Sequence, residues 1–298
     1  MYDLLVIGGG AAGMAAALAA EKSGAKRVLI AERESLPGGV LRQCRHNGFG
    51  LGYFHEDLTG QEYAARFISR LGESGIELRC DTTVLELRED KTALLSSAAG
   101  VEEVSFRKCV LATGCRERPI GALPVSGTRP AGIFTAGTAQ KMVNLMGLDV
   151  GQRILILGTG DIGMIMARRF SILGKKVIAM VEQLSAPGGL ARNVKNCIEA
   201  YSIPVLTRST VVRVHGSGRI SGVTVRNLDS GEERLISCDT LIVSVGLIPE
   251  RELVSGFSEL PEWLRLCGNC DYVHEIVDSV TVQAENVGRS ILDNCPSP

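Results

Sequence analysis

The sequence has few aromatic residues and almost no net charge. Phe, Trp and Tyr make up 4% of the 298 residues, and the formal net charge is -1. A nucleic-acid-binding surface usually needs an excess of basic residues, often with aromatic side chains on which bases stack. We therefore expect no nucleic-acid partner.

Long hydrophobic runs are also missing. No apolar segment approaches the roughly 20 residues that a membrane-spanning helix needs, so we expect no membrane insertion. The first apolar stretch, Leu4-Leu5-Val6-Ile7, has no basic segment before it and is interrupted at once by glycines, which is not the pattern of an export signal. The nine cysteines are accordingly expected to be thiols in a reducing cytoplasm.

Glycine is abundant, and much of it lies in a motif that occurs twice, 150 residues apart. The first copy is Gly8-Gly9-Gly10-Ala11-Ala12-Gly13, followed by Glu32 and Pro37-Gly38-Gly39. The second is Gly158-Thr159-Gly160-Asp161-Ile162-Gly163, followed by Glu182 and Pro187-Gly188-Gly189. One G-x-G-x-x-G is weak evidence of function, but two copies with the same internal spacing predict two dinucleotide sites.

Each copy lies within a predicted β-α-β unit. The apolar runs predict strands at 4–7, 28–31, 153–157 and 176–181, with helices over 11–23 and about 161–173. Further helices are predicted over 60–74 and about 273–292. Further strands are predicted within 76–110 and at about 205–214, 220–228, 233–237 and 241–245.

The chemistry of this motif is that of a phosphate cradle. The first glycine permits a tight turn, the second lets the backbone approach a pyrophosphate, and the third lets the helix pack on the strand. Glu32 and Glu182 each follow the last glycine by 19 residues, where an acid accepts hydrogen bonds from ribose hydroxyls. Because a carboxylate repels a 2′-phosphate, Glu182 predicts that NAD(H) is preferred over NADP(H).

With these motifs, nearly the whole chain resembles the FAD/NAD(P)-dependent pyridine nucleotide-disulfide oxidoreductases, flavoproteins with two dinucleotide-binding domains. The resemblance implies FAD in the first site and NAD(H) in the second. The positions that match the FAD site are Gly8, Gly10, Ala11, Ala12, Gly13, Glu32, Arg33, Gly38, Gly39, Thr113, Gly114, Gly268 and Asn269. Those that match the NAD site are Gly158, Gly160, Asp161, Ile162, Gly163, Glu182 and Gly246.

The expected fold is α/β, with two Rossmann-like three-layer dinucleotide-binding domains. The stretch 115–137 is rich in Pro, Gly and Arg, which is typical of a domain crossing. The strand that ends at Gly246 mirrors the strand before Gly114, so the chain is expected to return to its first domain there. We therefore predict an FAD domain over 1–118 and 246–298, with an NAD domain over 119–245 inserted into it.

A narrower resemblance concerns the segments Gln43–Leu51, Thr113–Pro119 and Gly132–Gly137. They are similar to a subgroup associated with glycerol-3-phosphate dehydrogenase-like proteins and amino-acid dehydrogenase α-subunits, which implies a partner dehydrogenase or iron–sulfur subunit. Two departures stand out. Neither of the superfamily's usual redox cysteine pairs is present, and the stretch between Pro249 and Leu264 looks too short for the strand and loop before the late glycine.

Cys44 is the main candidate for thiol chemistry. Arg42 and Arg45 flank it, and nearby cations lower a thiol pKa, although a place in the pocket wall is the plainer interpretation. Cys267 and Cys270 have C-x-x-C spacing, which is either a redox pair or an accident of the flavin-contact segment. Cys115 and His274 are weaker candidates, and Arg116, Arg118 and Arg129 form either an anion site or a solvated crossing.

We therefore expect an FAD-dependent oxidoreductase that exchanges hydride between NAD(H) and flavin, working with a partner dehydrogenase or iron–sulfur protein. One alternative is a stand-alone NADH oxidase or thiol reductase that uses Cys44. Another is a nucleotide-binding subunit without turnover. The sequence leaves open the electron acceptor, the direction of electron flow and whether the chain forms a homo-oligomer.

Overall fold

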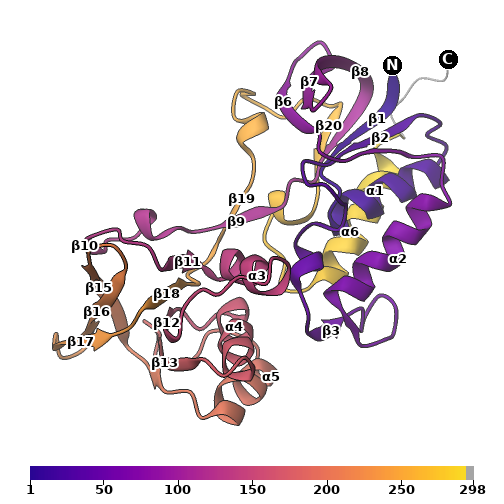
Figure 1. Cartoon of the computed structure of the whole chain (residues 1–298). Coiled ribbons are helices and arrows are strands. Elements are labelled where there is room, and N and C mark those ends of the chain that lie inside the picture. The colour runs from indigo at the N-terminus through magenta and orange to yellow at the C-terminus, as the bar shows by residue number, and fades with distance from the viewer. Residues whose placement is uncertain (293–298) are drawn as a thin grey trace. The chain divides into compact units, whose positions relative to one another are not determined.

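The computed structural model describes residues 1–292, and the chain divides into two compact units (Figure 1). The first comprises Met1–Arg116 and the segment from Ile248 onward, and the second is Glu117–Leu247. Residues 117–118 and 246–247 fall in the second unit, whereas the predicted boundaries put them in the first. Local hydrogen bonds account for this, because Glu117 Oε2 accepts Gly137 N–H at 2.7 Å and Gly246 O accepts Arg118 N–H at 3.0 Å.

The first unit is built on a seven-stranded sheet in the order β5-β2-β1-β8-β7-β6, with β20 also beside β8. β8 is long enough to belong to two layers, because its first half pairs antiparallel with β7 and its second half pairs parallel with β1 and β20. The strands are β1 (Tyr2–Ile7), β2 (Val28–Ala31), β5 (Glu77–Arg79), β6 (Thr83–Leu87), β7 (Thr92–Ser97), β8 (Gly100–Leu111) and β20 (Leu264–Leu266).

Three helices cover one face of this sheet: α1 (Ala11–Lys22), α2 (Gly60–Gly72) and α6 (Val277–Ser290). α1 is rich in alanine and almost wholly buried, and it packs closely on α6 (Figure 1). A Cβ on Gly288 of α6 would lie only 2.2 Å from the carbonyl oxygen of Ala16. The other face carries a second core under the β6–β8 meander, and a hairpin of β3 (Asn47–Phe49) and β4 (Leu58–Thr59) precedes α2.

The second unit repeats this plan with a parallel sheet in the order β11-β18-β12-β13-β14. Its strands are β11 (Ile133–Thr135), β12 (Arg153–Leu157), β13 (Lys176–Val181), β14 (Val205–Leu206) and β18 (Thr240–Val243). Helices α3 (Ala136–Asn144), α4 (Asp161–Ile172) and the short α5 (Ala191–Asn193) lie on one face. A mixed sheet of β10 (Ser126–Gly127), β15 (Ser209–Gly216), β16 (Ile220–Asn227) and β17 (Glu233–Ser237) covers the other face. In this sheet β10 pairs parallel with β15, and the other pairs are antiparallel.

The predicted fold class is confirmed. The first unit has the strand order β5-β2-β1-β8-β20 and the second the order β14-β13-β12-β18-β11, so four strands around each glycine motif correspond in space and in chain order. The fifth strand occupies the same place in both sheets, but β20 comes last in the chain in its sheet and β11 comes first in its own. The chain passes between the units through two short paired strands, β9 (Cys115–Glu117) and β19 (Leu247–Pro249).

Three local features differ from the sequence-based expectations. α3 was not predicted, and Thr135 begins it by accepting the N–H of Thr138. The predicted strand over 205–214 is two strands, because Arg208 between them has a left-handed φ of 46°. The last helix begins at Val277 rather than near 273.

Candidate dinucleotide-binding sites

The turn between β1 and α1 depends on two of its glycines. Gly8 has φ +105°, and a Cβ there would lie 2.5 Å from the carbonyl oxygen of Ala112. A Cβ on Gly13 would lie 1.8 Å from the carbonyl oxygen of Gly8. A Cβ on Gly10 would instead meet no atom within 4 Å. The first and third glycines are therefore required because the turn has no room for a side chain there, and the middle one faces open space.

That open space lies at an uncapped helix start. Gly10 precedes α1 and provides no side-chain acceptor, and the first turn contains no acidic residue. α2, by contrast, begins with a full capping box between Thr59 and Glu62. The first N–H groups of α1 carry the partial positive charge of the helix, so this end of α1 suits an anion such as pyrophosphate.

Glu32 lies beneath this turn at the end of β2 and is only 5% exposed. Its Oε2 accepts Gly9 N–H at 2.6 Å, and its Oε1 accepts Glu34 N–H at 2.8 Å. A carboxylate has about four acceptor positions, so a fixed Glu32 keeps about two of them for hydroxyl donors. The adjacent Arg33 is exposed.

The other predicted residues of the first set gather around the same turn. Gly38 N–H donates to Gly9 O at 2.8 Å, and a Cβ on Gly39 would lie 3.2 Å from Gly10 Cα. A Cβ on Gly268 would lie 2.7 Å from the Cβ of Ala12. Thr113 and Gly114 follow β8 next to β1, and Thr113 Oγ1 donates to Glu250 O at 2.6 Å.

The second copy forms the same turn between β12 and α4. Gly158 has φ +98°, and a Cβ there would lie 2.0 Å from the carbonyl oxygen of Ser244. Gly160 again faces open space and provides no side-chain cap to α4. Gly246 has φ +107° and lies in the same unit, with open space on its Cβ side. The backbone thus provides a second place for an anion.

Glu182 occupies the position of Glu32 but makes one more hydrogen bond. Its Oε2 accepts Thr159 N–H at 3.1 Å and Thr159 Oγ1–H at 2.5 Å, and its Oε1 accepts Leu184 N–H at 2.9 Å. The side chain is 7% exposed. Only about one acceptor position is therefore left for a ribose hydroxyl.

Asp161 makes the start of α4 different from that of α1. Its Oδ1 accepts Leu190 N–H at 2.9 Å and Asn193 Nδ2–H at 2.7 Å, and so holds the loop after Pro187-Gly188-Gly189 against the helix. Gly163 completes the turn, with a Cβ position 3.0 Å from Gly158 O, and Ile162 packs against the helical core. The structural roles of Thr159 and Asn193 were not apparent from the sequence.

Asp278 of α6 is another residue that the sequence-based prediction missed. It is 8% exposed, and its carboxylate accepts Gly50 N–H at 3.1 Å and Gly52 N–H at 2.7 Å. Tyr53 in the same loop donates its hydroxyl to Glu285. These bonds tie the β3–β4 hairpin to α6, and their only sequence signal is an acid in the first turn of a helix.

Gln283 of α6 organises the late glycine segment. Its Oε1 accepts Gly268 N–H at 2.7 Å, and its Nε2 donates to Asp271 Oδ2 at 2.7 Å. His274 Nε2 lies 3.0 Å from the same Oε1, and Asn269 Oδ1 accepts His274 N–H at 3.1 Å. His274 thus lies in a hydrogen-bonded turn before α6 rather than at the start of the helix.

The structure corrects the expectation of a thiolate at Cys44. The side chain is 8% exposed, and burial raises the pKa of its thiol to about 12. Its Sγ donates to Val40 O at 3.4 Å. The flanking arginines do not offset the cost of burying a charge, so Cys44 is a protonated thiol at neutral pH.

Cys267 and Cys270 do not form a surface dithiol. Both are fully buried, Cys267 in the core beneath α1 and α6 and Cys270 in the core on the other face of the sheet. Burial raises the pKa of both thiols. Their C-x-x-C spacing follows from the turn that contains Gly268. Cys115 is partly exposed, and its Sγ accepts Asn269 Nδ2–H at 3.6 Å.

The predicted cluster of basic residues is not an open anion site. Arg116 pairs with Glu250 at 3.0 Å and with Glu252. Arg129 donates to backbone carbonyls, including that of Val125 at 2.6 Å. Of the three predicted residues Arg116, Arg118 and Arg129, the first and the last are therefore bound to acceptors.

No helix within residues 1–292 has the length and apolar character needed to cross a membrane.

Comparison with known proteins places these sites in a family. Residues 2–262 match the pyridine nucleotide-disulphide oxidoreductase family. The chain is 29% identical over 272 residues to the alpha subunit of sarcosine oxidase from Corynebacterium sp. (strain U-96), covering 83% of this chain and 26% of that protein. It is 28% identical over 281 residues to an opine oxidase subunit of Agrobacterium tumefaciens (strain Ach5), covering 85% and 54%. The chain thus spans about half or less of these relatives.

Among solved structures, thioredoxin reductase of T. acidophilum aligns with a TM-score of 0.80 over 98% of both chains, at 20% identity. This likeness concerns the fold. The concern that the stretch after Pro249 is too short was wrong, because β20 forms and pairs with β8, and Val254 and Trp263 join the core beside it.

Proposed function

The chain belongs to the pyridine nucleotide-disulphide oxidoreductase family, and we propose that it exchanges hydride between NAD(H) and FAD and shares electrons with a partner protein. Family membership makes it an FAD-dependent oxidoreductase that uses a pyridine nucleotide. The observation that supports the proposal most is the pair of uncapped helix starts, each with an open middle glycine and a fixed acid, in one chain.

The first site fits FAD. The open space at Gly10 and the start of α1 would take the pyrophosphate, and the free acceptor positions of Glu32 would take the adenosine ribose. When bound, FAD supplies the acceptor for hydride from the nicotinamide. Gln283 fixes the Gly268–Asn269 turn beside α1, and Asp278 fixes the hairpin that follows Cys44. These residues hold the walls of the site rather than react.

The second site fits a pyridine nucleotide, and we propose that it prefers NAD(H). Glu182 is held by Thr159 and Leu184 with its charge beneath the turn, so a 2′-phosphate would meet a buried carboxylate. We expect NADH to exceed NADPH in kcat/KM by at least about tenfold, which corresponds to about 1.4 kcal/mol. Glu182→Ala should narrow that ratio. Equal kcat/KM for the two nucleotides in the unaltered chain would contradict this role of Glu182.

The partner belongs to the same proposal. Both relatives described above are named as subunits, and the chain matches only part of each. The Gln43–Leu51, Thr113–Pro119 and Gly132–Gly137 segments suggest a subgroup that works beside a dehydrogenase. A stand-alone thiol reductase using Cys44 is disfavoured, because that thiol is buried and protonated.

An anaerobic NADH titration of the purified chain, followed by its visible spectrum, tests the proposal. We expect a yellow protein that bleaches with about one equivalent and then reacts slowly with oxygen, since the natural acceptor is a partner. Rapid oxygen consumption by the lone chain would favour an NADH oxidase. A colourless chain that cannot be reconstituted with FAD would overturn the proposal and favour a nucleotide-binding role without turnover.

A further inference from the structure

The second unit contains a groove of about 440 Å³ that neither dinucleotide motif lines. It is lined by Arg153 at the start of β12, Ile178 and Ala179 of β13, Pro204 and Leu206 at β14, and the four residues Arg234–Ser237 of β17. Arg153 begins β12, whereas Gly158 follows its last residue. The groove therefore lies toward the end of the strand opposite to the glycine turn.

The groove lies between the free edges of two sheets. β17 is the last strand of the mixed sheet, and β14 is the last strand of the parallel sheet. Within residues 1–292, neither has a strand on its outer side. Successive side chains of a strand point to opposite faces, so a groove that only one face of β17 lined would touch alternate residues. Four consecutive residues line this one, so the edge of β17 borders it.

The floor of the groove is apolar and incompletely covered. Ile178, Leu206 and Ile236 are half-buried, and Leu235 is 69% exposed. A free edge with an exposed leucine readily accepts another strand, and most proteins cover or block such edges. The exposed edge of β17 suits an extended chain, which can pair with it, rather than a helix.

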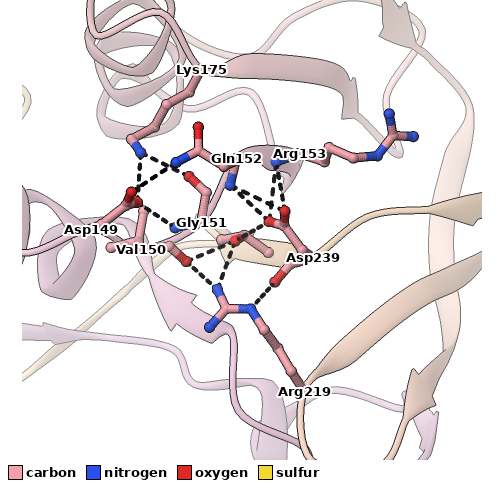
Figure 2. A network of polar contacts seen from close by, with 9 residues as sticks. Asp149, Val150, Gly151, Gln152, Arg153, Lys175, Arg219 and Asp239 are labelled. Carbon is pink, nitrogen blue, oxygen red and sulfur yellow. Dashed lines mark hydrogen bonds and ion pairs between the residues drawn. The ribbon is translucent and has the colours of Figure 1, made fainter.

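The charges of the groove have one sign. Arg153 and Arg234 line it, and none of its lining residues is acidic. Figure 2 shows how Arg153 is held: its backbone N–H bonds to Asp239, while its side chain extends away from the Asp149–Lys175 network. Its Nη2 donates to Ser237 O at 3.3 Å, beside the edge of β17. Glu233, the nearest acid along β17, pairs with Arg226 at 2.5 Å.

We propose that this groove binds an extended segment of a partner polypeptide that alternates apolar and acidic residues, by strand addition to β17. The segment would complete the backbone hydrogen bonds of the free edge, place apolar side chains over Ile178 and Leu206, and direct carboxylates at Arg153 and Arg234. Nothing in this binding requires flavin or nucleotide, so it stands apart from the proposed hydride exchange.

The test uses the full chain and two fluorescein-labelled octapeptides. One has Val at every second position and Thr or Glu between them, with two Glu in all. The matched control has Lys in place of both Glu. Fluorescence anisotropy should show saturable binding of the Glu peptide, at least about tenfold tighter than the Lys peptide, as expected for two opposed charge contacts. Amide hydrogen exchange should slow in residues 233–237, and saturating NADH should leave binding unchanged.

Variants localise the effect. Arg234→Glu should weaken binding of the Glu peptide at least about tenfold. Arg168→Glu, an equal charge change at an exposed position of α4, should change binding less than about twofold. Equal binding of both peptides, or no added protection at 233–237 with about 1 mM Glu peptide, well above the Kd of a specific contact, would overturn the proposal. A concentration-dependent dimer that Arg234→Glu dissociates would also overturn it, by showing that a second copy fills the groove. The flavin spectrum of each variant reports separately on the proposed function.

Discussion

The two copies of the glycine motif share a backbone but differ in how much of each site the protein fills. In the first, Glu32 accepts two backbone N–H groups, and no acid lies in the first turn of the helix. In the second, Thr159 replaces Gly9 and takes two acceptor positions of Glu182, and Asp161 places a carboxylate at the helix start. The first site therefore leaves more acceptor positions for ribose hydroxyls and places less negative charge beside a bound pyrophosphate.

The loops that follow the two copies are also held differently. In the first unit, Asp278 reaches the hairpin from α6, which lies far later in the chain. In the second, Asp161 holds the loop from the adjacent helix start. The anchor of the first loop is on α6, which packs on α1 in the core, whereas the anchor of the second loop is on the helix that begins at its own glycine turn. This difference suits a resident cofactor in the first site and an exchanging one in the second.

The largest expected effect comes from breaking the third glycine in each copy. Gly13→Ala puts a Cβ at 1.8 Å from a carbonyl oxygen, whereas Gly163→Ala puts one at 3.0 Å. We expect Gly13→Ala to lower the free energy of unfolding by about 3 kcal/mol and Gly163→Ala by about 1 kcal/mol, because the backbone must shift much further to relieve a contact of 1.8 Å than one of 3.0 Å. Urea unfolding measures both, and the reverse order would contradict the packing difference.

The second comparison removes the loop anchors. Asp278→Ala leaves two N–H groups without a carboxylate acceptor and should cost about 2 kcal/mol, the range for hydrogen bonds to a charged group. Asn193→Ala removes one bond to Asp161 and should cost about 1 kcal/mol or less. Thermal unfolding, with hydrogen exchange at residues 47–59, checks both. Equal losses would show that the long-range anchor has no special role.

The third prediction concerns pH. The position that corresponds to Cys44 in the second copy is Val194, which cannot ionise. The unfolded thiol ionises near pH 8.5, but burial raises the pKa of folded Cys44 to about 12. The contribution of the protonated Cys44 thiol to the free energy of unfolding is complete below about pH 8.5. It is lost as pH rises toward 12, by up to about 1.4 kcal/mol per pH unit. Cys44→Val should flatten the loss of stability between about pH 8 and 10. Parallel curves for the two proteins would contradict burial of the thiol.

The smallest expected effect concerns the charge at the start of α4. Asp161→Asn keeps an oxygen for Leu190 and Asn193 but removes a negative charge from the helix start. We expect the Kd for NADH to fall about two- to threefold, in line with roughly 0.3–1 kcal/mol for a charge at a helix terminus. Asp161→Ala, which also loses the loop contacts, is the control and should not improve binding. Isothermal titration at low salt measures both.

Periodicity and glycine spacing predicted most of the fold because they report local physics. The strands β2 and β13 fall within their predicted bounds, since a buried parallel strand is a continuous apolar run. α3 was missed because its segment follows a stretch rich in Pro, Gly and Arg. The anchors Asp278 and Gln283 were missed because their partners, which include Gly50, are identified only by the tertiary structure. The two interpretations of Cys44, a thiolate or a pocket-wall residue, stayed open in the sequence because it shows neighbouring charges but not burial.

The discontinuity of the first unit also bears on how the chain is synthesised. The second unit, Glu117–Leu247, is a continuous segment and can fold as soon as it leaves the ribosome. The first unit must wait for β20 to join β8 and for α6 to cover α1, where Gly288 lies against Ala16. Until then, the alanine-rich face of α1 stays bare while the inserted unit is made. Chaperone binding to nascent chains should therefore concentrate on residues 1–116 and end once α6 has emerged.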